Sequence, residues 1–222
     1  MSNDVNDLDE ILQVLKLEKD LTNKQTLKDY IDLLFKWHEK NNILSTRNRK
    51  YFLQRDMHDS LSILDYLPQG NVLDIGTGAG IPGMLLSFFT TDNIILLDRR
   101  QNAVRFLEHA KLKLGLNNVR IIKSDINEMN IDESLSCVLI KNFSNKIVSK
   151  LSFEDKINYI AKVIRNRIDL NVPIYILTGS IALKTRDFSD ELKARLRSDF
   201  IVTKIQTPYF DTNRYLLEIR YV

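Results

Sequence analysis

The stretch VLDIGTGAGIPG, residues 72–83, decides how the rest of the chain is interpreted. An apolar run ends near Asp74, and four glycines and a proline follow within eight residues. This order predicts the first strand-to-helix turn of an open α/β sheet, where ligands lie beyond the carboxyl ends of the strands. At Gly76, Gly78 and Gly80 the missing side chains let backbone N–H groups approach a ligand closely.

Strand-like and helix-like segments alternate after Gly70. Short apolar runs bounded by turn or polar residues occur at 71–75, 94–97, 119–123, 135–140 and 172–177. Helix-like segments lie near 80–90, 101–115 and 153–169. Two further runs, 200–206 and 214–222, flank a polar turn with Pro208 and predict an antiparallel hairpin. We therefore expect an α/β fold with a mostly parallel, Rossmann-like sheet of seven strands, covered by helices on both faces.

The first 69 residues are read as helices, and Pro68 and Gly70 stop the last of them. We expect residues 1–69 to form an N-terminal helical segment packed on the core. The sheet and the ligand site then belong to a second part, residues 70–222.

Composition excludes several classes of protein. The 222 residues are 44% hydrophobic, yet no apolar run approaches the ~20 residues needed to cross a bilayer. The acidic start excludes a secretory signal, and the single Cys137 lies in an apolar stretch typical of a core residue. We expect a cytoplasmic protein without a membrane partner. The net charge of +3 permits RNA binding without arguing for it.

Three successive predicted strands each end in an acid, at Asp74, Asp98 and Asp125. A dinucleotide fingerprint needs a glycine where this chain has Ile81, so the glycine spacing suits a ligand without a pyrophosphate. Asp98 lies 22 residues after Gly76, where a carboxylate accepts hydrogen bonds from both ribose hydroxyls of an adenosine. Asp125 lies where adenine edges are held. Acids at strand ends also cap helices, but the ordered set favours S-adenosylmethionine over NAD.

Several passages resemble the glucose-inhibited division protein B family, also called ribosomal RNA small subunit methyltransferase G. The main matches are LDIGTGAGIPGMLLS and LLDRRQNAVRFLEHAKLKLGLNNVRII, and the I-P-G separates this family from other class I methyltransferases. Further matches are LLFKWHEKNNIL, RDMHDSL, YILTGS and NRYLLEIR. The resemblance runs from about residue 25 to the C-terminus. It implies a class I methyltransferase that uses S-adenosylmethionine to methylate N7 of a guanosine in small-subunit (16S) rRNA.

The resemblance also implies site residues. The family's cofactor contacts fall on Gly76, Ile81, Ile126, Asn127 and Lys141. The wider class I pattern adds Gly78, Gly80 and Asp98, and the acid-glycine order adds Asp74 and Asp125. The family's basic pocket corresponds to Asp125, Lys141, Thr178 and Arg214.

This chain departs from the family pattern at four positions. Lys141 and Thr178 replace an arginine and a lysine, and Asp125 and Asp56 replace an arginine and a histidine. Lysine keeps the charge but loses the bidentate fork, whereas threonine loses the charge altogether. Two alternatives therefore stay open. One is a class I methyltransferase with a small-molecule or protein acceptor, and the other is an impaired RNA-binding assembly factor.

Methylation of guanine N7 requires few catalytic groups. N7 carries a lone pair and no proton, so alignment replaces a general base. Lys141 and Arg214 are the candidates for positioning, through contacts with rRNA phosphate, and Phe143 either stacks on a base or packs in the core. No histidine has a metal-ligand partner at useful spacing, so no metal site is expected. The expected partner is small-subunit rRNA or the 30S particle, bound by a monomer.

Overall fold

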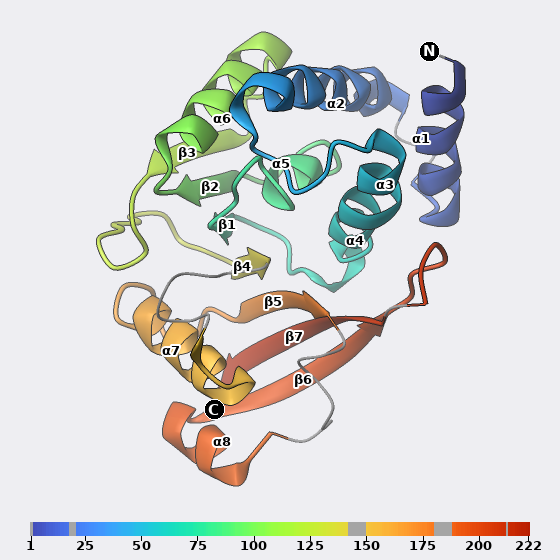
Figure 1. Ribbon diagram of the computed structural model, residues 1–222. Coiled ribbons are helices and arrows are strands. Elements are labelled where there is room, and N and C mark those ends of the chain that lie inside the picture. The colour runs from blue at the N-terminus through green and yellow to red at the C-terminus, as the bar shows by residue number, and fades with distance from the viewer. Residues whose placement is uncertain (1, 18–20, 142–149, 180–187, 212) are drawn as a thin grey trace.

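A computed structural model describes residues 2–17, 21–141, 150–179, 188–211 and 213–222 (Figure 1). One sheet of seven strands has the order β3-β2-β1-β4-β5-β7-β6. The strands are β1 (Val72–Ile75), β2 (Ile94–Asp98), β3 (Val119–Lys123), β4 (Cys137–Lys141), β5 (Ile174–Gly179), β6 (Ser198–Ile205) and β7 (Arg214–Tyr221). Strands β1 to β5 pair in parallel, and β7 is antiparallel to both β5 and β6. The mostly parallel sheet with its terminal hairpin is confirmed.

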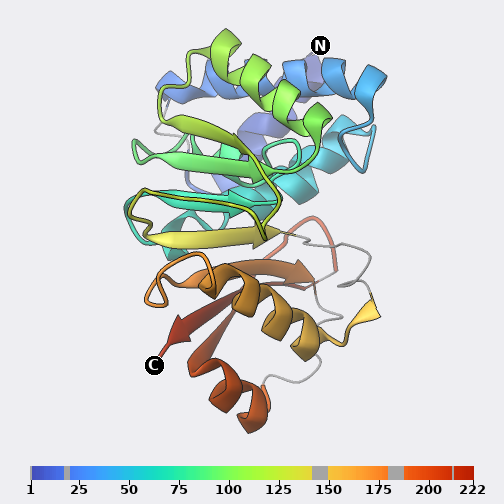
Figure 2. The same ribbon diagram turned by 90° about the vertical axis from the view of Figure 1, so that its left-hand side faces the viewer.

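Helices accompany the sheet on both faces. They are α1 (Ser2–Val14), α2 (Leu21–Asn41), α3 (Arg49–Phe52), the π-helical turn η1 (Leu53–Met57), α4 (His58–Leu61), the 3-10 turn η2 (Leu64–Tyr66), α5 (Gly83–Leu86), α6 (Gln101–Leu114), α7 (Phe153–Arg165) and α8 (Asp190–Leu196). Figures 1 and 2 show α2 and α6 beside the β3–β1 half of the sheet and α7 and α8 beside the β5–β6 half. No helix in the described ranges is both long and apolar enough to cross a membrane.

The side chains of the strands alternate between two cores. On β1, Val72 packs into the core formed with α2, α5 and α6, whereas Leu73 packs into the core formed with α7 and α8. On the same alternation Asp74, Asp98 and Lys141 all face the α2 side, at the carboxyl ends of β1, β2 and β4. The fold therefore brings three charged groups to one face at one edge of the sheet.

Two expected helices differ in the structure. The helix expected over 80–90 is only α5, because the glycines of the preceding turn have positive φ values that a right-handed α-helix does not contain. The last helix expected before Pro68 is divided among α3, η1, α4 and η2. Helix α8 was not expected; it has only seven residues, starts at the cap Ser189 and ends at Arg197 with a left-handed φ of 46°.

Candidate cofactor and active site

The turn after β1 takes a shape that favours glycine. Gly78 and Gly80 have φ values of +62° and +88°, which residues with a Cβ rarely adopt. A Cβ on Gly80 would also collide with Met84 and lie 3.0 Å from the hydroxyl of Tyr30. At the start of the turn, the backbone N–H of Gly76 donates to the Leu97 carbonyl on β2 at 2.7 Å. The turn is thus fixed between β2 and α2.

Asp98, at the end of β2, meets this turn as expected. Its carboxylate is 3% exposed, and Oδ2 accepts a hydrogen bond from the Gly78 N–H at 2.8 Å. Oδ1 accepts the backbone N–H of Arg100 at 2.8 Å. The Arg100 guanidinium also contacts both oxygens at 3.2 Å, although 61% of its side chain is exposed. The buried carboxylate of Asp98 is therefore covered by the exposed side chain of Arg100, which a ligand could displace.

Asp74 is fully buried beneath the same turn. Its Oδ2 accepts hydrogen bonds from the Thr77 hydroxyl at 2.6 Å and from the Gly83 N–H at 2.8 Å. Oδ1 is buried and has no hydrogen-bond partner among the described residues. Burial raises the pKa of Asp74 to about 6, against the hydrogen bonds of Thr77 and Gly83, which lower it. The site thus contains one carboxylate oxygen that lacks a donor.

Lys141, at the end of β4, is held by an acid from the helical segment. Its side chain is 4% exposed, and Nζ lies 3.0 Å from Oδ1 and 3.4 Å from the backbone carbonyl of Asp56. The other oxygen, Oδ2, accepts Nη2 of Arg55 at 2.5 Å and Nε at 3.2 Å. Burial acts to raise the pKa of Asp56, but Lys141 and Arg55 together keep it below its ordinary value. Asp56 and Lys141, two of the four residues that depart from the family pattern, therefore form an ion pair with each other.

A second ion pair joins the same helical segment to β7. Arg214 Nε lies 2.6 Å from Oδ2 of Asp59, which is almost fully buried. Its Nη1 also lies close to Gly179 at the end of β5, since a Cβ there would be 3.1 Å away. Both positioning candidates, Lys141 and Arg214, are therefore anchored by carboxylates.

Three predicted cofactor residues, Asp125, Ile126 and Asn127, follow β3. Asp125 Oδ1 accepts the backbone N–H of Asn127 at 3.1 Å and its side-chain Nδ2 at 2.8 Å. Oδ2 lies 3.6 Å from Nη1 of Arg99, which follows β2. These backbone and side-chain hydrogen bonds and Arg99 lower the pKa of Asp125. The carboxylate thus closes a local turn, while the neighbouring Ile126 packs into the α7 side core and Ile81 against the α2 side core.

Other predicted residues lie elsewhere or are not described. Thr178 is on β5 opposite Tyr215 of β7, and it is partly buried. Phe143 lies outside the described residues. Sequence reasoning missed Tyr30, whose hydroxyl donates to the Ala79 carbonyl in the glycine turn. It also missed the role of Arg55, because neither residue type nor spacing indicates that its guanidinium meets the buried carboxylate of Asp56.

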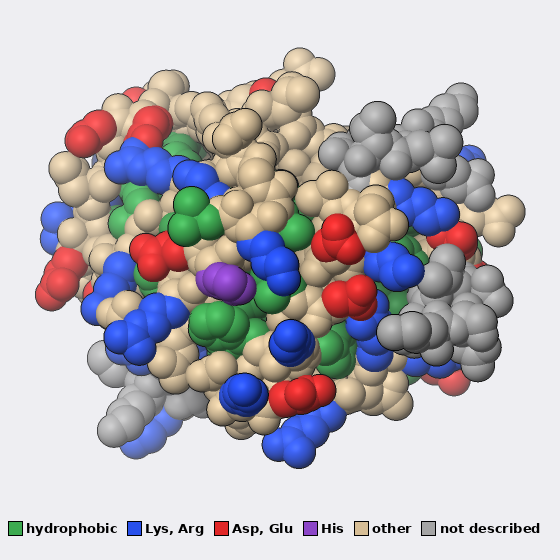
Figure 3. All heavy atoms as spheres, turned by 90° about the horizontal axis from the view of Figure 1, so that it is seen from above, with side chains coloured by type: hydrophobic (Ala, Val, Ile, Leu, Met, Phe, Trp, Pro, Cys, Tyr) green, Lys and Arg blue, Asp and Glu red, His purple; other side chains and the backbone are tan. Residues whose placement is uncertain are grey.

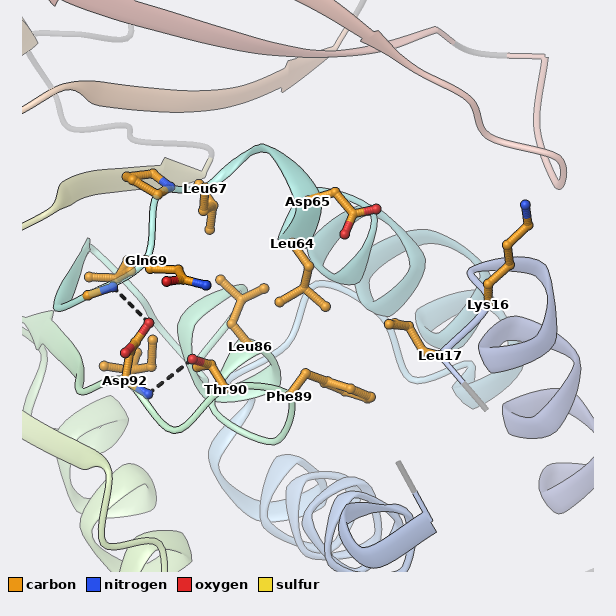
Figure 4. A pocket seen from close by; sticks show the side chains of 14 residues that line it. Lys16, Leu17, Leu64, Asp65, Leu67, Gln69, Leu86, Phe89, Thr90 and Asp92 are labelled. Carbon is orange, nitrogen blue, oxygen red and sulfur yellow. Dashed lines mark hydrogen bonds between the residues drawn. The ribbon is translucent and has the colours of Figure 1, made fainter. Parts of the chain in front are cut away.

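A cavity of about 350 Å³ opens at the other edge of the sheet, near the amino ends of β1 and β2 (Figure 4). Leu64, Leu86 and Phe89 form its apolar wall, and Asp92 at its rim accepts the Gly70 N–H at 2.7 Å. It lies away from Asp74 and Asp98, so we do not assign it to the cofactor. In the described part of the chain, no group of three or more His, Cys, Asp or Glu side chains is arranged to hold a metal ion.

The face over α2 and α6 carries mixed charge. Figure 3 shows Lys and Arg side chains interspersed with Asp and Glu on the described part of this face, with no continuous basic surface. The pairs Lys24–Asp9 and Arg49–Asp32 account for part of this mixture. We therefore do not assign an RNA-binding surface to this face.

Known proteins resemble the chain in sequence and in fold. Residues 23–165 match the family model described as rRNA small subunit methyltransferase G. Ribosomal RNA small subunit methyltransferase G of Shewanella halifaxensis is 28% identical over 200 residues, covering 88% of this chain and 88% of that protein. A SAM dependent methyltransferase from Aquifex aeolicus has a TM-score of 0.52 at 16% identity, covering 78% of this chain and 93% of that one. M. jannaschii TYW2 in complex with AdoMet has a TM-score of 0.53 at 13% identity, covering 75% and 76%.

Proposed function

The chain belongs to the rRNA small subunit methyltransferase G family, and we propose that it transfers a methyl group from S-adenosylmethionine to N7 of a guanosine in small-subunit rRNA. It is an S-adenosylmethionine-dependent methyltransferase of ribosomal RNA with a Rossmann-like fold. The methylated atom is the part that we propose, together with a monomeric state and action in the cytoplasm. The observation that carries the proposal is the meeting of the glycine turn, Asp74 and Asp98 at one edge of the sheet.

The residues at this edge fit S-adenosylmethionine. We assign the ribose hydroxyls to Asp98, because its exposed partner Arg100 can give way to them. We assign the methionyl ammonium to Asp74, whose Oδ1 lacks a donor among the described residues. The backbone of Gly76, Gly78 and Gly80 would follow the cofactor, and Ile81, Asp125, Ile126 and Asn127 would surround the adenine. Lys141 lies at the same edge.

The chemistry then depends on orientation. S-adenosylmethionine supplies an electrophilic methyl group on a sulfonium. Guanine N7 needs no deprotonation before it attacks, so the protein has no proton to remove. Asp74 and Asp98 fix the two ends of the cofactor, and Lys141 and Arg214 are proposed to position the acceptor. Their carboxylate partners restrict the movement of both cations, which suits positioning.

The test is the modification state of small-subunit rRNA in a deletion strain. Borohydride reduction followed by aniline cleavage maps N7-methylguanosine as a strand break. We expect one break to disappear on deletion and to return with a plasmid copy of the wild-type chain. A copy carrying Asp98→Ala, which removes the ribose-binding carboxylate, should not restore it. An unchanged break pattern in the deletion strain would rule the proposal out.

The acceptor is tested separately with labelled methyl groups. We expect transfer to purified 30S particles or to naked 16S rRNA, and nucleoside analysis of the product identifies the atom. Exclusive labelling of a protein or metabolite fraction would favour a different acceptor on the same scaffold. Calorimetry should show micromolar binding of S-adenosylmethionine, and its absence would favour the assembly-factor interpretation.

A further inference from the structure

Two carboxylates, Asp56 and Asp74, lie near the buried ammonium of Lys141 at the carboxyl ends of the strands. Lys141 contacts Asp56 at 3.0 Å, yet its charge also acts on Asp74, whose pKa it lowers. In the register of β1 and β4, Asp74 is paired with Leu139. Lys141 lies two residues further along β4 on the same face. Neighbouring strands lie about 4.8 Å apart and rise about 3.3 Å per residue, so the Cα atoms of Asp74 and Lys141 lie about 8 Å apart, within reach of a lysine side chain. The ammonium can therefore reach either acid.

The N-terminal helical segment determines which carboxylate the Lys141 ammonium contacts. Arg55 bonds Oδ2 of Asp56 and leaves Oδ1 directed to Lys141. Arg55 is itself fixed, because Nη2 donates to the Ser45 hydroxyl at 2.8 Å and its guanidinium stacks over the Tyr51 ring at 4.5 Å. The backbone carbonyl of Asp56 provides a second, longer contact at 3.4 Å. Asp56 is thus a prearranged partner, positioned before any ligand binds.

Asp74 remains available because of this arrangement. Its Oδ2 is occupied by Thr77 and Gly83, and only Oδ1 lacks a partner among the described residues. A buried ammonium that lost Asp56 would turn to this oxygen, since an unpaired buried charge is strongly unfavourable. The methionyl ammonium of the cofactor would then meet an acid already neutralised by Lys141.

We propose that Asp56 is a positioning residue that holds the Lys141 ammonium away from Asp74, so that Asp74 stays free for the ammonium of S-adenosylmethionine. The inference rests on the cofactor assignment of the proposed function. It explains why the unusual aspartate and the unusual lysine occur together in this chain: the acid at 56 restrains the flexible amine at 141. Asp56 acts through Lys141 and is not assigned a contact with substrate.

Calorimetric titration of S-adenosylmethionine into the wild type, D56N, K141M and the double variant D56N/K141M tests the proposal. Loss of one charge-assisted hydrogen bond at Asp74 weakens binding about tenfold, which is the change expected for D56N. The double variant should bind more tightly than D56N, because it also removes the ammonium that occupies Asp74. This gain is expected if the ammonium of Lys141 occupies Asp74 once Asp56 is removed. A purely structural role of Asp56 does not give this order.

Glu218→Gln is the matched control. Glu218 is a buried carboxylate on β7 that accepts the Tyr175 hydroxyl at 2.9 Å, and β7 is separated from β1 by β4 and β5. We expect a lower melting temperature without a change in cofactor affinity. Melting of each variant without cofactor shows that it is folded, and D56S replaces D56N if the latter does not fold.

Two results would overturn the inference: wild-type affinity in D56N, or a double variant that binds no more tightly than D56N. The titration needs no rRNA, so it remains informative even if the methylated atom proves not to be N7. A wild-type chain that does not bind S-adenosylmethionine would overturn the cofactor assignment together with this inference.

Discussion

At the scale of single residues, we propose that Arg100 limits how freely the cofactor reaches Asp98. Its guanidinium contacts both carboxylate oxygens at 3.2 Å and lies beside Gly78, where a Cβ would be 3.0 Å away. An exposed ion pair of this kind contributes about 0.2–1 kcal/mol. Because ribose hydroxyls must share or replace this partner, Arg100→Ala should bind S-adenosylmethionine up to about fivefold more tightly in calorimetry.

The control for Arg100 is another exposed arginine. Arg120 pairs with Glu133 near the amino end of β3, away from the glycine turn, and Arg120→Ala should leave cofactor affinity unchanged. If Arg100→Ala weakened binding instead, Arg100 would have to contact the cofactor itself.

Asp74 makes the stability of the protein depend on pH. Burial raises its pKa from 3.8 to about 6, against the hydrogen bonds of Thr77 and Gly83, while the charge of Asp98 adds to the rise and that of Lys141 opposes it. Between these two values the folded state holds more protons than the unfolded chain, so stability falls as pH rises through this window. Asp74→Asn removes the cost of the buried charge. Its free energy of unfolding should therefore exceed that of the wild type by about 1–3 kcal/mol above pH 6.

Urea denaturation at pH 4 and pH 7.5 checks the prediction for Asp74→Asn. The gain should shrink toward zero at the lower pH, where Asp74 is protonated in the folded wild type. Asp56 should have the opposite effect on the pH dependence of stability. Because its pKa is lowered in the folded state, it stabilises the protein at pH values above the ordinary pKa of an aspartate, and this contribution is lost as the pH falls. A gain in Asp74→Asn that is the same at both pH values would contradict the assignment of the effect to ionisation.

At the scale of secondary-structure elements, α2 supports the cofactor turn through Tyr30. This side chain is fully buried, its ring lies 6.0 Å from that of Phe106, and its hydroxyl donates to the Ala79 carbonyl. Tyr30→Phe leaves that carbonyl without its donor, at a cost of about 1–3 kcal/mol in stability. The turn should also lose its fixed position, and affinity for S-adenosylmethionine should fall severalfold in calorimetry.

Tyr175→Phe is the control that distinguishes a specific effect on the glycine turn from a general loss of stability. Tyr175 is also buried, and its hydroxyl donates to Glu218 on β7, remote from the glycine turn. We expect it to lower the melting temperature by a similar amount with no change in affinity. Equal effects of the two substitutions on affinity would show that Tyr30 has no specific role at the turn.

The same elements show why the fold was largely predictable. Every residue of strands β1, β2 and β4 is buried, so each is a short, nearly continuous apolar run, whereas β3 at the edge of the sheet is partly exposed. The predicted bounds of β1 to β5 lie within about two residues of the structure. The helix expected over 80–90 was wrong, because residues up to Pro82 are used by a turn that depends on long-range contacts with Tyr30 and Leu97. A seven-residue helix such as α8 has too little periodicity to be recognised.

The candidate site was predictable only where it is local in sequence. The meeting of Asp74, Asp98 and the glycines was predictable because acids at the ends of parallel strands gather at one edge. The contacts of Tyr30 with Ala79 and of Lys141 with Asp56 span 49 and 85 residues. Both contacts depend on how the helical segment packs against the sheet. The spacing of residues in the sequence does not indicate this packing.

At the scale of the whole molecule, the helical segment and the sheet share one core. Residues from α1, α2, α5, α6 and the strands belong to a single buried cluster, which includes Leu34, Phe106 and Cys137. The boundary at residues 69–70 therefore separates two parts of the sequence. We propose that these two parts do not unfold independently. This interpretation predicts one cooperative unfolding transition for both parts.

Two natural probes test this prediction. Trp37, the single tryptophan, lies on α2 with its ring 5.8 Å from Phe106, and Cys137, the single cysteine, is buried on β4. Burial raises the pKa of the Cys137 thiol to about 12, so it should react with a thiol reagent only after unfolding. We expect fluorescence, circular dichroism and thiol reactivity to give the same urea midpoint, and Cys137→Ala should abolish only the last signal. If the Trp37 fluorescence changed at a lower urea concentration than the reactivity of Cys137, the helical segment would unfold by itself. The ion pair between Asp56 and Lys141 would then break before the sheet unfolds.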